Sequence, residues 1–327
     1  MALAALVLTG GLVTLWGWVG LDAGRHSLRD GASGPGGRLV DWFGDGISMK
    51  ANAAVTAAAL AGAVLLGQLR RGRLARWIAL ALAVGAGAIG AATLLQHVAG
   101  WELGIDGLLA KEFPGARATS APGRMGLPAS TSFTLVGAAA AVAIWRRATA
   151  SPALLRRSGR LAVGLTVIVC IIASASLLGH LYGADTMFAI PGLTGIAVQT
   201  ASMLLALGVA VLCTLEDRSP VRVLVDPGTG GLLARRAIAV VVLLPVVLGH
   251  LRTLGERAGY FDAPTGRALL ILSLIGLLLW LLFGSAAVIR RREQRALAAE
   301  RAGDVRYRML FNSIDQGFCI VEVDFEG

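Results

Sequence analysis

The chain has 327 residues, of which 56% are hydrophobic and only 15% charged, and its mean hydropathy is +0.71. Soluble domains carry about 25% charged residues, so this composition excludes an ordinary soluble protein and indicates one that lies in a membrane. The net charge of +10 comes from basic residues in short loops between apolar segments, which argues for a lipid bilayer and against a nucleic-acid partner.

Eight apolar segments are long enough, alone or with their flanks, to cross a bilayer as helices of about 20 residues. They are 2–20, 51–69, 77–95, 131–145, 161–182, 193–215, 238–251 and 269–289. The first has no basic residue ahead of it and no good cleavage site after it, so we interpret it as a membrane span rather than a signal peptide. The sequence therefore predicts an all-α fold, a polytopic membrane helix bundle of about eight transmembrane helices in residues 1–290.

Basic residues are distributed unevenly between the loops. Arginines are concentrated after the second, fourth, sixth and eighth segments, whereas the other loops balance basic residues with acidic ones. The side richer in Arg and Lys is the cytoplasmic one, so we expect both termini inside the cell. The three cysteines, Cys170, Cys213 and Cys319, form no CxxC pair, so a disulfide framework is not expected.

Internal repeats relate the apolar segments to one another. MKANAAVTAAALAG from Met49, MGLPASTSFTLVG from Met125 and MFAIPGLTGIAV from Met187 look like three similar starts of inward-running helices. The preceding helices end in LLQHVAG, LLGHLYG and, before the eighth segment, VLGHLRT. These matches predict four successive helical hairpins.

Small and polar residues in these segments carry further expectations. Asn52 and Ser130 are expected to cap helix starts, and Pro128 and Pro191 to lie in first turns. Ala58 with Gly62, Ala83 with Gly87, and Ala86 with Gly90 have the small-xxx-small spacing that brings membrane helices close together.

Three histidines, His97, His180 and His250, lie at corresponding places near the outer ends of outgoing helices. Neutral imidazoles from different helices can bind Zn or Cu or titrate as a pH sensor. The structural alternative is a ring hydrogen bond to a loop carbonyl, because a repeat places similar residues at equivalent positions without any ligand. Both interpretations are kept at this point.

The longest informative outer loop is 100–125, GWELGIDGLLAKEFPGARATSAPGRM. Within it, LGIDGLL predicts a short amphipathic helix at the membrane surface. A candidate outward-facing pocket is formed by Met49, Asp106, Arg124, Met125 and Met187. In that pocket Arg124 would hold an anionic ligand beside Asp106; the alternative is that Arg124 reaches the lipid headgroups and that the methionines only start and pack helices.

Groups that carry chemistry are few. No Asp, Glu, Lys or Arg lies in the middle of an apolar segment, which argues against an ion-coupled transporter or pump. The sequence contains no phosphate loop, nucleophile elbow or HExxH motif. We therefore expect no enzyme within this chain and no evident cofactor.

WELGIDGLL followed by PGRMGLPASTSFTLVG, in residues 101–137, resembles the membrane-associated sensor regions of bacterial signalling proteins. Such regions precede PAS domains, histidine kinase cores and diguanylate cyclase domains. Met49–Asn52, read MKAN, looks like a first-repeat version of the same signature. The family pattern has Thr-Ala-Leu after the proline, whereas Ala129, Ser130 and Thr131 follow Pro128 here.

The final stretch, RYRMLFNSIDQGFCIVEVDFEG in residues 306–327, is similar to the opening of a PAS domain in sensor histidine kinases. A PAS fold needs on the order of a hundred residues, so the resemblance implies a truncated N-terminal part of that domain. Residues 291–305 favour helix, and Ala298, Ala302, Val305 and Met309 recur at helical spacing. This stripe is typical of a signalling helix that pairs with its twin in a homodimer; a solvated charged helix is the alternative.

The resemblance implies a sensory input module in the bacterial cytoplasmic membrane. The last transmembrane helix and the linker would pass a stimulus to a cytoplasmic PAS domain and a histidine kinase, with a cognate response regulator as partner. ATP would bind only in the kinase part, outside this chain. A diguanylate cyclase output is the close variant. The alternatives are a small-molecule permease, with Asn52, Gln199 and Thr200 as its polar path, and a non-signalling membrane scaffold.

Overall fold

The computed structural model of the chain describes residues 1–24, 35–42, 46–68, 72–112, 117–146, 152–189, 193–215, 228–284 and 294. Within these ranges every regular element is a helix, which confirms the predicted all-α class for this part of the chain. The chain divides into two compact units, Met1–Asp226 and Pro227–Gly327. The predicted linker, apart from residue 294, and the predicted PAS opening at 306–327 lie outside the described residues.

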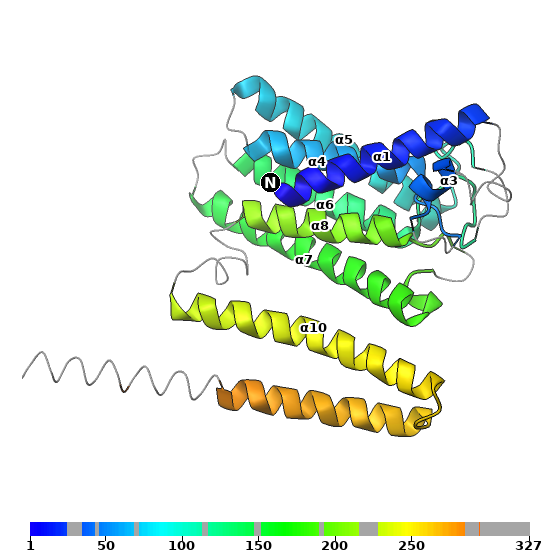
Figure 1. The fold of residues 1–327 in the computed structure, drawn as a ribbon. Helices are drawn as coiled ribbons and strands as arrows, with labels where there is room; N and C mark the ends of the chain where they lie inside the picture. The colour runs from blue at the N-terminus through cyan, green and yellow to red at the C-terminus, as the bar shows by residue number, and fades with distance from the viewer. Residues whose placement is uncertain are drawn as a thin grey trace, which may run out of the picture. The chain divides into compact units, whose positions relative to one another are not determined.

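Unit 1 contains six long helices, which Figure 1 shows side by side. They are α1 (Ala2–Gly24), α4 (Ala51–Gln68), α5 (Arg73–Ala99), α6 (Leu127–Arg146), α7 (Pro152–Tyr182) and α8 (Val198–Thr214). Short helices precede α4 and α8, namely α3 (Pro35–Val40) and the 3-10 turn η1 (Asp185–Met187). Unit 2 contains α10 (Thr229–Arg257) and a helix at Ala263–Gly284.

Each of the eight predicted apolar segments overlaps one of these helices, although residues 285–289 of the eighth lie outside the described residues. In the described part of the chain seven helices are long and apolar enough to cross a membrane, and α8 is an apolar helix of 17 residues. The chain is therefore a helical protein with several candidate membrane-spanning helices. Length and apolar composition decide this result, because a span needs about 20 residues at 1.5 Å each.

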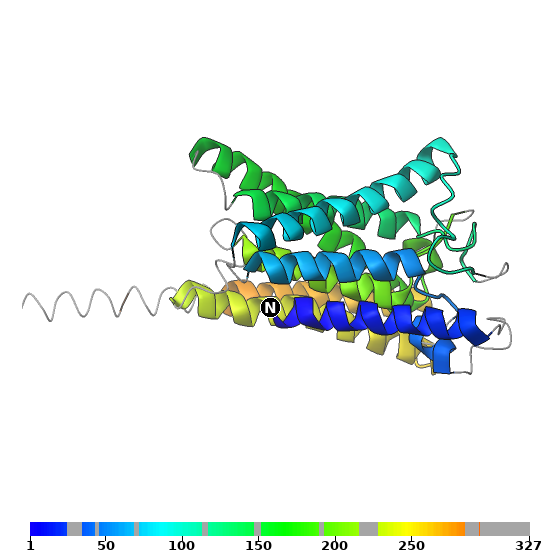
Figure 2. The same ribbon diagram turned by 90° about the horizontal axis from the view of Figure 1, so that it is seen from above.

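The helices of unit 1 form a closed ring of three pairs, which are α1 with α4, α5 with α6, and α7 with α8. Helices α4, α6 and α8 all contact one another at the centre. Each outer helix packs against two of them: α1 against α4 and α8, α5 against α4 and α6, and α7 against α6 and α8. Within their apolar windows, 61% of α4 and 56% of α6 is buried, against 28% of α5 and of α7, which agrees with this division into inner and outer helices. Figure 2 gives a second view of the six helices.

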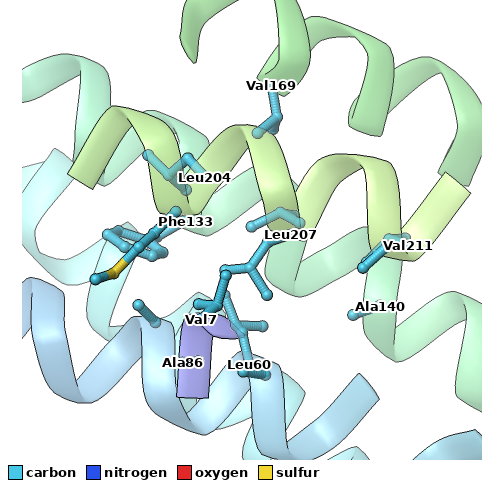
Figure 3. Packing of buried hydrophobic residues seen from close by; sticks show 14 of the residues in the cluster. Val7, Leu60, Ala86, Phe133, Ala140, Val169, Leu204, Leu207 and Val211 are labelled. Atoms are coloured by element: carbon cyan, nitrogen blue, oxygen red, sulfur yellow. The ribbon is translucent and has the colours of Figure 1, made fainter. Parts of the chain in front are cut away.

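The core of unit 1 lies where the three inner helices meet. Leu60 of α4, Phe133 of α6, and Leu204 and Leu207 of α8 are fully buried there, together with Val7 of α1. Figure 3 shows these side chains converging from their separate helices. Apolar contacts of this kind fix the helices in place, because dispersion contacts replace the hydrophobic effect inside a bilayer.

The small-residue pattern predicted for α5 is confirmed by its contact with α6. A Cβ added to Gly90 would lie 2.8 Å from the backbone nitrogen of Thr134, and one added to Gly137 would lie 2.6 Å from the Cα of Gly87. These positions therefore bring two helix backbones together. Gly62 differs, since a Cβ there would meet only Leu82, at an ordinary 3.7 Å.

Three local predictions are corrected by the structure. The segment LGIDGLL forms turns and bends rather than a helix, because Gly104 has a φ of 67°, outside the right-handed helical region. The third inner helix starts at Val198, and Met187 lies earlier, in η1. Ser130 lies inside α6 and donates its hydroxyl to the carbonyl of Leu127. Its predicted capping role is therefore wrong, whereas Pro128 does lie in the first turn of α6, as predicted.

Unit 2 does not repeat the helix ends of unit 1. His97 and His180 lie in the last turns of α5 and α7, whereas α10 continues about two turns beyond His250, to Arg257. The connection after α10 is ordered by the Asp262 carboxylate, which accepts a hydrogen bond from the backbone N–H of Thr265 at 3.2 Å. Hydrogen bonds from Thr265 lower the pKa of the Asp262 carboxyl. Because His250 lies about two turns before the end of α10, its predicted correspondence with His97 and His180 is wrong.

Candidate functional site: a buried polar cap at one end of the three helix pairs

The same ring-to-carbonyl hydrogen bond closes each helix pair of unit 1. Trp18 donates its indole N–H to the carbonyl of Met49 at 2.8 Å. His97 contacts the carbonyl of Met125 through Nε2 at 2.8 Å, and His180 that of Ile196 at 2.9 Å. A carbonyl oxygen only accepts, so each histidine donates from Nε2. In all three pairs the inner helix begins two residues after the acceptor, at Ala51, Leu127 and Val198.

This arrangement accounts for two of the three candidate metal-ligating histidines. The Nε2 atoms of His97 and His180 are used in hydrogen bonds to loop carbonyls, and the ring of His180 also stacks on Phe188 with centroids 3.8 Å apart. His250 belongs to the other unit and is exposed. Among the residues that the structure describes, no group of three or more His, Cys, Asp or Glu side chains could hold a metal ion. The geometry thus supports the hydrogen-bonding interpretation for His97 and His180.

A buried ion pair, Lys50 with Glu112, lies directly before α4. The two side chains are 5% and 0% exposed. Glu112 also accepts hydrogen bonds from the Ser48 hydroxyl at 3.1 Å and from the backbone N–H of Gly123 at 2.7 Å. Lys50 donates to the Thr119 hydroxyl at 2.8 Å. The pair therefore joins the segment before α4 to both halves of the loop between α5 and α6.

The electrostatics of this pair follow from its burial. Removal from water lowers the pKa of Lys50, because burial penalises the charged ammonium, and the adjacent Glu112 carboxylate raises that pKa and offsets part of the effect. The extra hydrogen bonds to Glu112 are what a desolvated carboxylate needs, since an ion pair alone rarely offsets the loss of water.

Asp106 is the centre of a second set of contacts. Its Oδ2 accepts hydrogen bonds from Arg124 Nε and from Gln96 Nε2, both at 2.8 Å. The side chains of Asp106 and Arg124 are only 13% and 16% exposed. Next to it, Asn52 donates from its side-chain amide to the carbonyl of Ile105 at 3.2 Å. The loop segment 101–112 is therefore attached to α4, to α5 and to the residues before α6.

The start of α8 is held by a third set of contacts. Gln199 donates from its side-chain amide to the carbonyl of Val40, which also accepts the backbone N–H of Met49 at 2.9 Å. The backbone N–H of Gly195 donates to Ala118 at 2.8 Å. A Cβ on Gly126 would lie 2.1 Å from the carbonyl oxygen of Gly195, so only glycine permits this approach. We call these three sets, together with the ring-to-carbonyl hydrogen bonds of Trp18, His97 and His180, the polar cap.

The polar cap differs from the pocket predicted from sequence. Asp106 and Arg124 are brought together, but as an ion pair. Met49 and Met125 are fully buried, while Met187 is 50% exposed. Sequence reasoning missed Lys50, Glu112, Gln96 and Gln199 as members of this site. A usable signal was present for Lys50 alone, because it is a charged residue directly before the apolar helix α4.

Unit 2 has an apolar groove. The groove has a volume of about 710 Å³ and is lined by α10 and the following helix, including Val240, Leu244, Leu277 and Trp280. Its lining is almost wholly apolar, and its one hydroxyl, that of Ser273, donates to the carbonyl of Leu269. The groove thus offers no polar anchor for a small ligand, which specific pockets normally have.

Chemically, the polar cap can hold loops and helix ends in register, and within it the Ser48 hydroxyl donates to the Glu112 carboxylate at 3.1 Å. Its ion pairs, side-chain amide hydrogen bonds and ring-to-carbonyl hydrogen bonds connect the start of each inner helix to the neighbouring loops and helix ends. Comparisons of the chain with protein-family models, with curated protein sequences and with solved structures found no match.

Proposed function

We propose that this chain is the membrane-embedded sensory input module of a bacterial signal-transduction protein. The observation that carries the proposal is the polar cap, in which loop residues such as Asp106 and Glu112 are bonded directly to the starts and ends of the helices. A stimulus that moves these loops would move helix ends with them. Packed helices respond to such changes by small shifts between discrete arrangements.

The topology that belongs to this proposal has eight spans and both termini in the cytoplasm. The Arg-rich loops supply the argument for orientation, and α8 would be the eighth span if its flanking residues complete it. The polar cap would then face away from the cytoplasm, and the membrane would be the bacterial cytoplasmic membrane.

The output is inferred from sequence resemblance. The last helix, the linker 291–305 and the PAS-like opening at 306–327 would carry the signal to a histidine kinase, and a diguanylate cyclase is the close variant. In this proposal the protein is a homodimer, the kinase part binds ATP and phosphorylates a response regulator, and the present chain is not itself catalytic.

The permease alternative depended on Asn52, Gln199 and Thr200 as a polar path. Asn52 donates its side-chain amide to the carbonyl of Ile105 in the loop, and Gln199 donates to the carbonyl of Val40 at the end of α3. Asn52, Gln199 and Thr200 are all buried. Amides used in this way fix loop positions, which favours a sensor over a permease. The scaffold alternative differs from a sensor in having no output that depends on the linker.

The proposal is tested by inserting one, two, three or four alanines after Ala298 in the full-length protein. Each residue rotates a helix by about 100°, so two insertions should disturb output most and four should largely restore it. Kinase or cyclase activity in isolated membranes is the measurement. The same insertions after Arg71, between α4 and α5, form the control for general damage. Output that is indifferent to the number of residues inserted at Ala298 would reject helical transmission and leave the scaffold.

A further inference from the structure

The loop segment 101–112, which we call the cap loop, exposes a cluster of large apolar side chains. Trp101 is 57% exposed, Leu103 45%, Leu108 75% and Leu109 54%. Single exposed apolar residues are ordinary, but several in a short segment indicate a surface that meets another apolar phase.

The exposure of these side chains does not come from a loosely held loop. Several of its polar groups are bonded to the bundle: the carbonyl of Ile105 accepts from Asn52, and the Asp106 carboxylate accepts from Gln96 and Arg124. The charged Glu102 and Lys111, near its two ends, are exposed. Glu112 closes the segment with a fully buried side chain. The loop therefore has a bonded polar side and an apolar side without contacts to cover it, as a segment at a membrane boundary requires.

The position of the cap loop along α5 identifies the apolar phase. Trp77 is 63% exposed and follows Arg76 near the start of α5, and Trp101 comes 24 residues later (101 − 77). The helical part, from Trp77 to Ala99, has 22 steps (99 − 77), or about 33 Å at 1.5 Å per residue, which lies between the roughly 30 Å of the hydrocarbon core and the 40–45 Å of the whole bilayer. Tryptophan is enriched at both interfaces. If Trp77 lies at one interface, Trp101 lies at the other.

The exposed side of α5 also runs directly into the cap loop. Leu95 is 45% exposed and Val98 78%, and they precede Trp101 on the chain. The apolar side of the cap loop thus continues a helix side that a bilayer would cover.

We propose that Trp101, Leu103, Leu108 and Leu109 insert into the boundary between headgroups and acyl chains of the adjacent leaflet, so that the cap loop is a lipid anchor. This inference rests on the membrane location in the proposed function and deepens it, because it makes the bilayer a source of the stimulus. A change in the depth of the loop would act on Gln96 and Arg124 through Asp106.

The test places an environment-sensitive fluorophore, NBD, at residue 108. The full chain carries Leu108→Cys with Cys170→Ala, Cys213→Ala and Cys319→Ala, in nanodiscs of phosphatidylcholine and phosphatidylglycerol. We expect blue-shifted emission, quenching by lipids spin-labelled near the headgroup, and a several-fold smaller iodide quenching constant than in the Arg117→Cys control. Arg117 lies in the same loop and its side chain is 59% exposed. Leu109→Cys repeats the measurement if the first variant does not fold.

Iodide quenching at residues 108 and 109 equal to that at 117 would overturn the proposal and point to a water-facing surface for a protein partner. Quenching by the spin-labelled lipids assigns the shielding to lipid rather than to protein. The result is independent of the insertions at Ala298, because a lipid anchor can exist in a protein that transmits no signal.

Discussion

At the scale of single residues, the buried pair of Lys50 and Glu112 carries a large desolvation cost. Two charges are almost wholly removed from water beside a core of apolar side chains. Their attraction is supported by bonds from Ser48, Gly123 and Thr119. Because those partners come from separate segments, the pair determines how the segments meet as well as how stable they are.

Replacing Glu112 by Gln should destabilise unit 1 strongly. The substitution keeps the shape of the side chain but leaves the Lys50 ammonium buried without a counter-charge, which costs about 3–5 kcal/mol in comparable sites. The free energy of unfolding, followed by tryptophan fluorescence in detergent micelles, is the measurement. Glu102→Gln is the matched control, because Glu102 is exposed and should change stability by less than about 0.5 kcal/mol. Equal effects of the two substitutions would contradict a structural role for the pair.

The same variant should show a specific pH dependence. Burial already lowers the pKa of Lys50, and removal of Glu112 removes the group that opposes this shift. Between the still lower pKa of Lys50 in the variant and its lowered pKa in the wild type, only the folded variant has lost this proton, so the stability of the variant rises with pH while that of the wild type does not. The stability difference between Glu112→Gln and the wild type should therefore shrink as the pH is raised through this window. A difference that stays constant would show that Lys50 is already well solvated.

At the scale of helices, the aromatic ring of one side chain, Trp18, His97 or His180, bonds the end of each outer helix to the residues before the next inner helix. Substituting Trp18→Phe, His97→Leu or His180→Leu removes a donor and leaves a buried carbonyl unpaired, at a cost of about 1–3 kcal/mol each. His250→Leu, at an exposed position, should change the free energy of unfolding little.

The amount of bound metal should be the same in the wild type and in a variant with His97, His180 and His250 all changed to Ala. Metal lost only from the variant would restore the metal interpretation.

The contact between α5 and α6 permits a matched pair of substitutions on one helix. In Gly90→Ala the new Cβ meets the backbone of Thr134 and Ser130, at 2.8 and 3.0 Å, which cannot move aside as a side chain can. We expect a loss of about 1–3 kcal/mol from overpacking. Gly85 has nothing within 4 Å of an added Cβ, so Gly85→Ala should leave stability unchanged or raise it by up to about 1 kcal/mol. If both variants melt alike, the two helices do not pack as closely as described.

The helices could be predicted from the sequence, because the length of an apolar segment is enough to specify a helix. The polar contacts that connect the helices could not be predicted. Lys50 and Glu112 are 62 residues apart in the chain, and hydropathy carries no information about such pairs. Met187 misled the prediction because its segment resembles the true helix starts, while Ile196 supplies the carbonyl that Met49 and Met125 supply in the other pairs. In LGIDGLL the apolar spacing suggested a helix, but Gly104 and the bonds to Asp106 favour a turn.

At the scale of the whole molecule, the ring of unit 1 is complete without unit 2. A chain ending at Asp226 should therefore fold, with a melting temperature in micelles within a few degrees of that of the full chain, because its buried cluster lies wholly within unit 1. A chain ending at residue 146 is the control. It lacks α7 and α8, so Leu60 and Phe133 lose the partners that Leu204 and Leu207 provide, and it should aggregate. Aggregation of the longer chain as well would show that unit 1 depends on unit 2.

A closed ring of helices has no first member. Helix α1 packs against α8 as well as against α4, and the polar cap lies at the end of α1 and at the start of α8. The beginning of α1 and the end of α8 therefore lie together at the opposite end of the bundle. A gene that joined these two ends by a short linker and began instead at α5 would encode the same contacts in a different order. We expect such a chain to adopt the fold of unit 1, because the contacts between its helices would be unchanged.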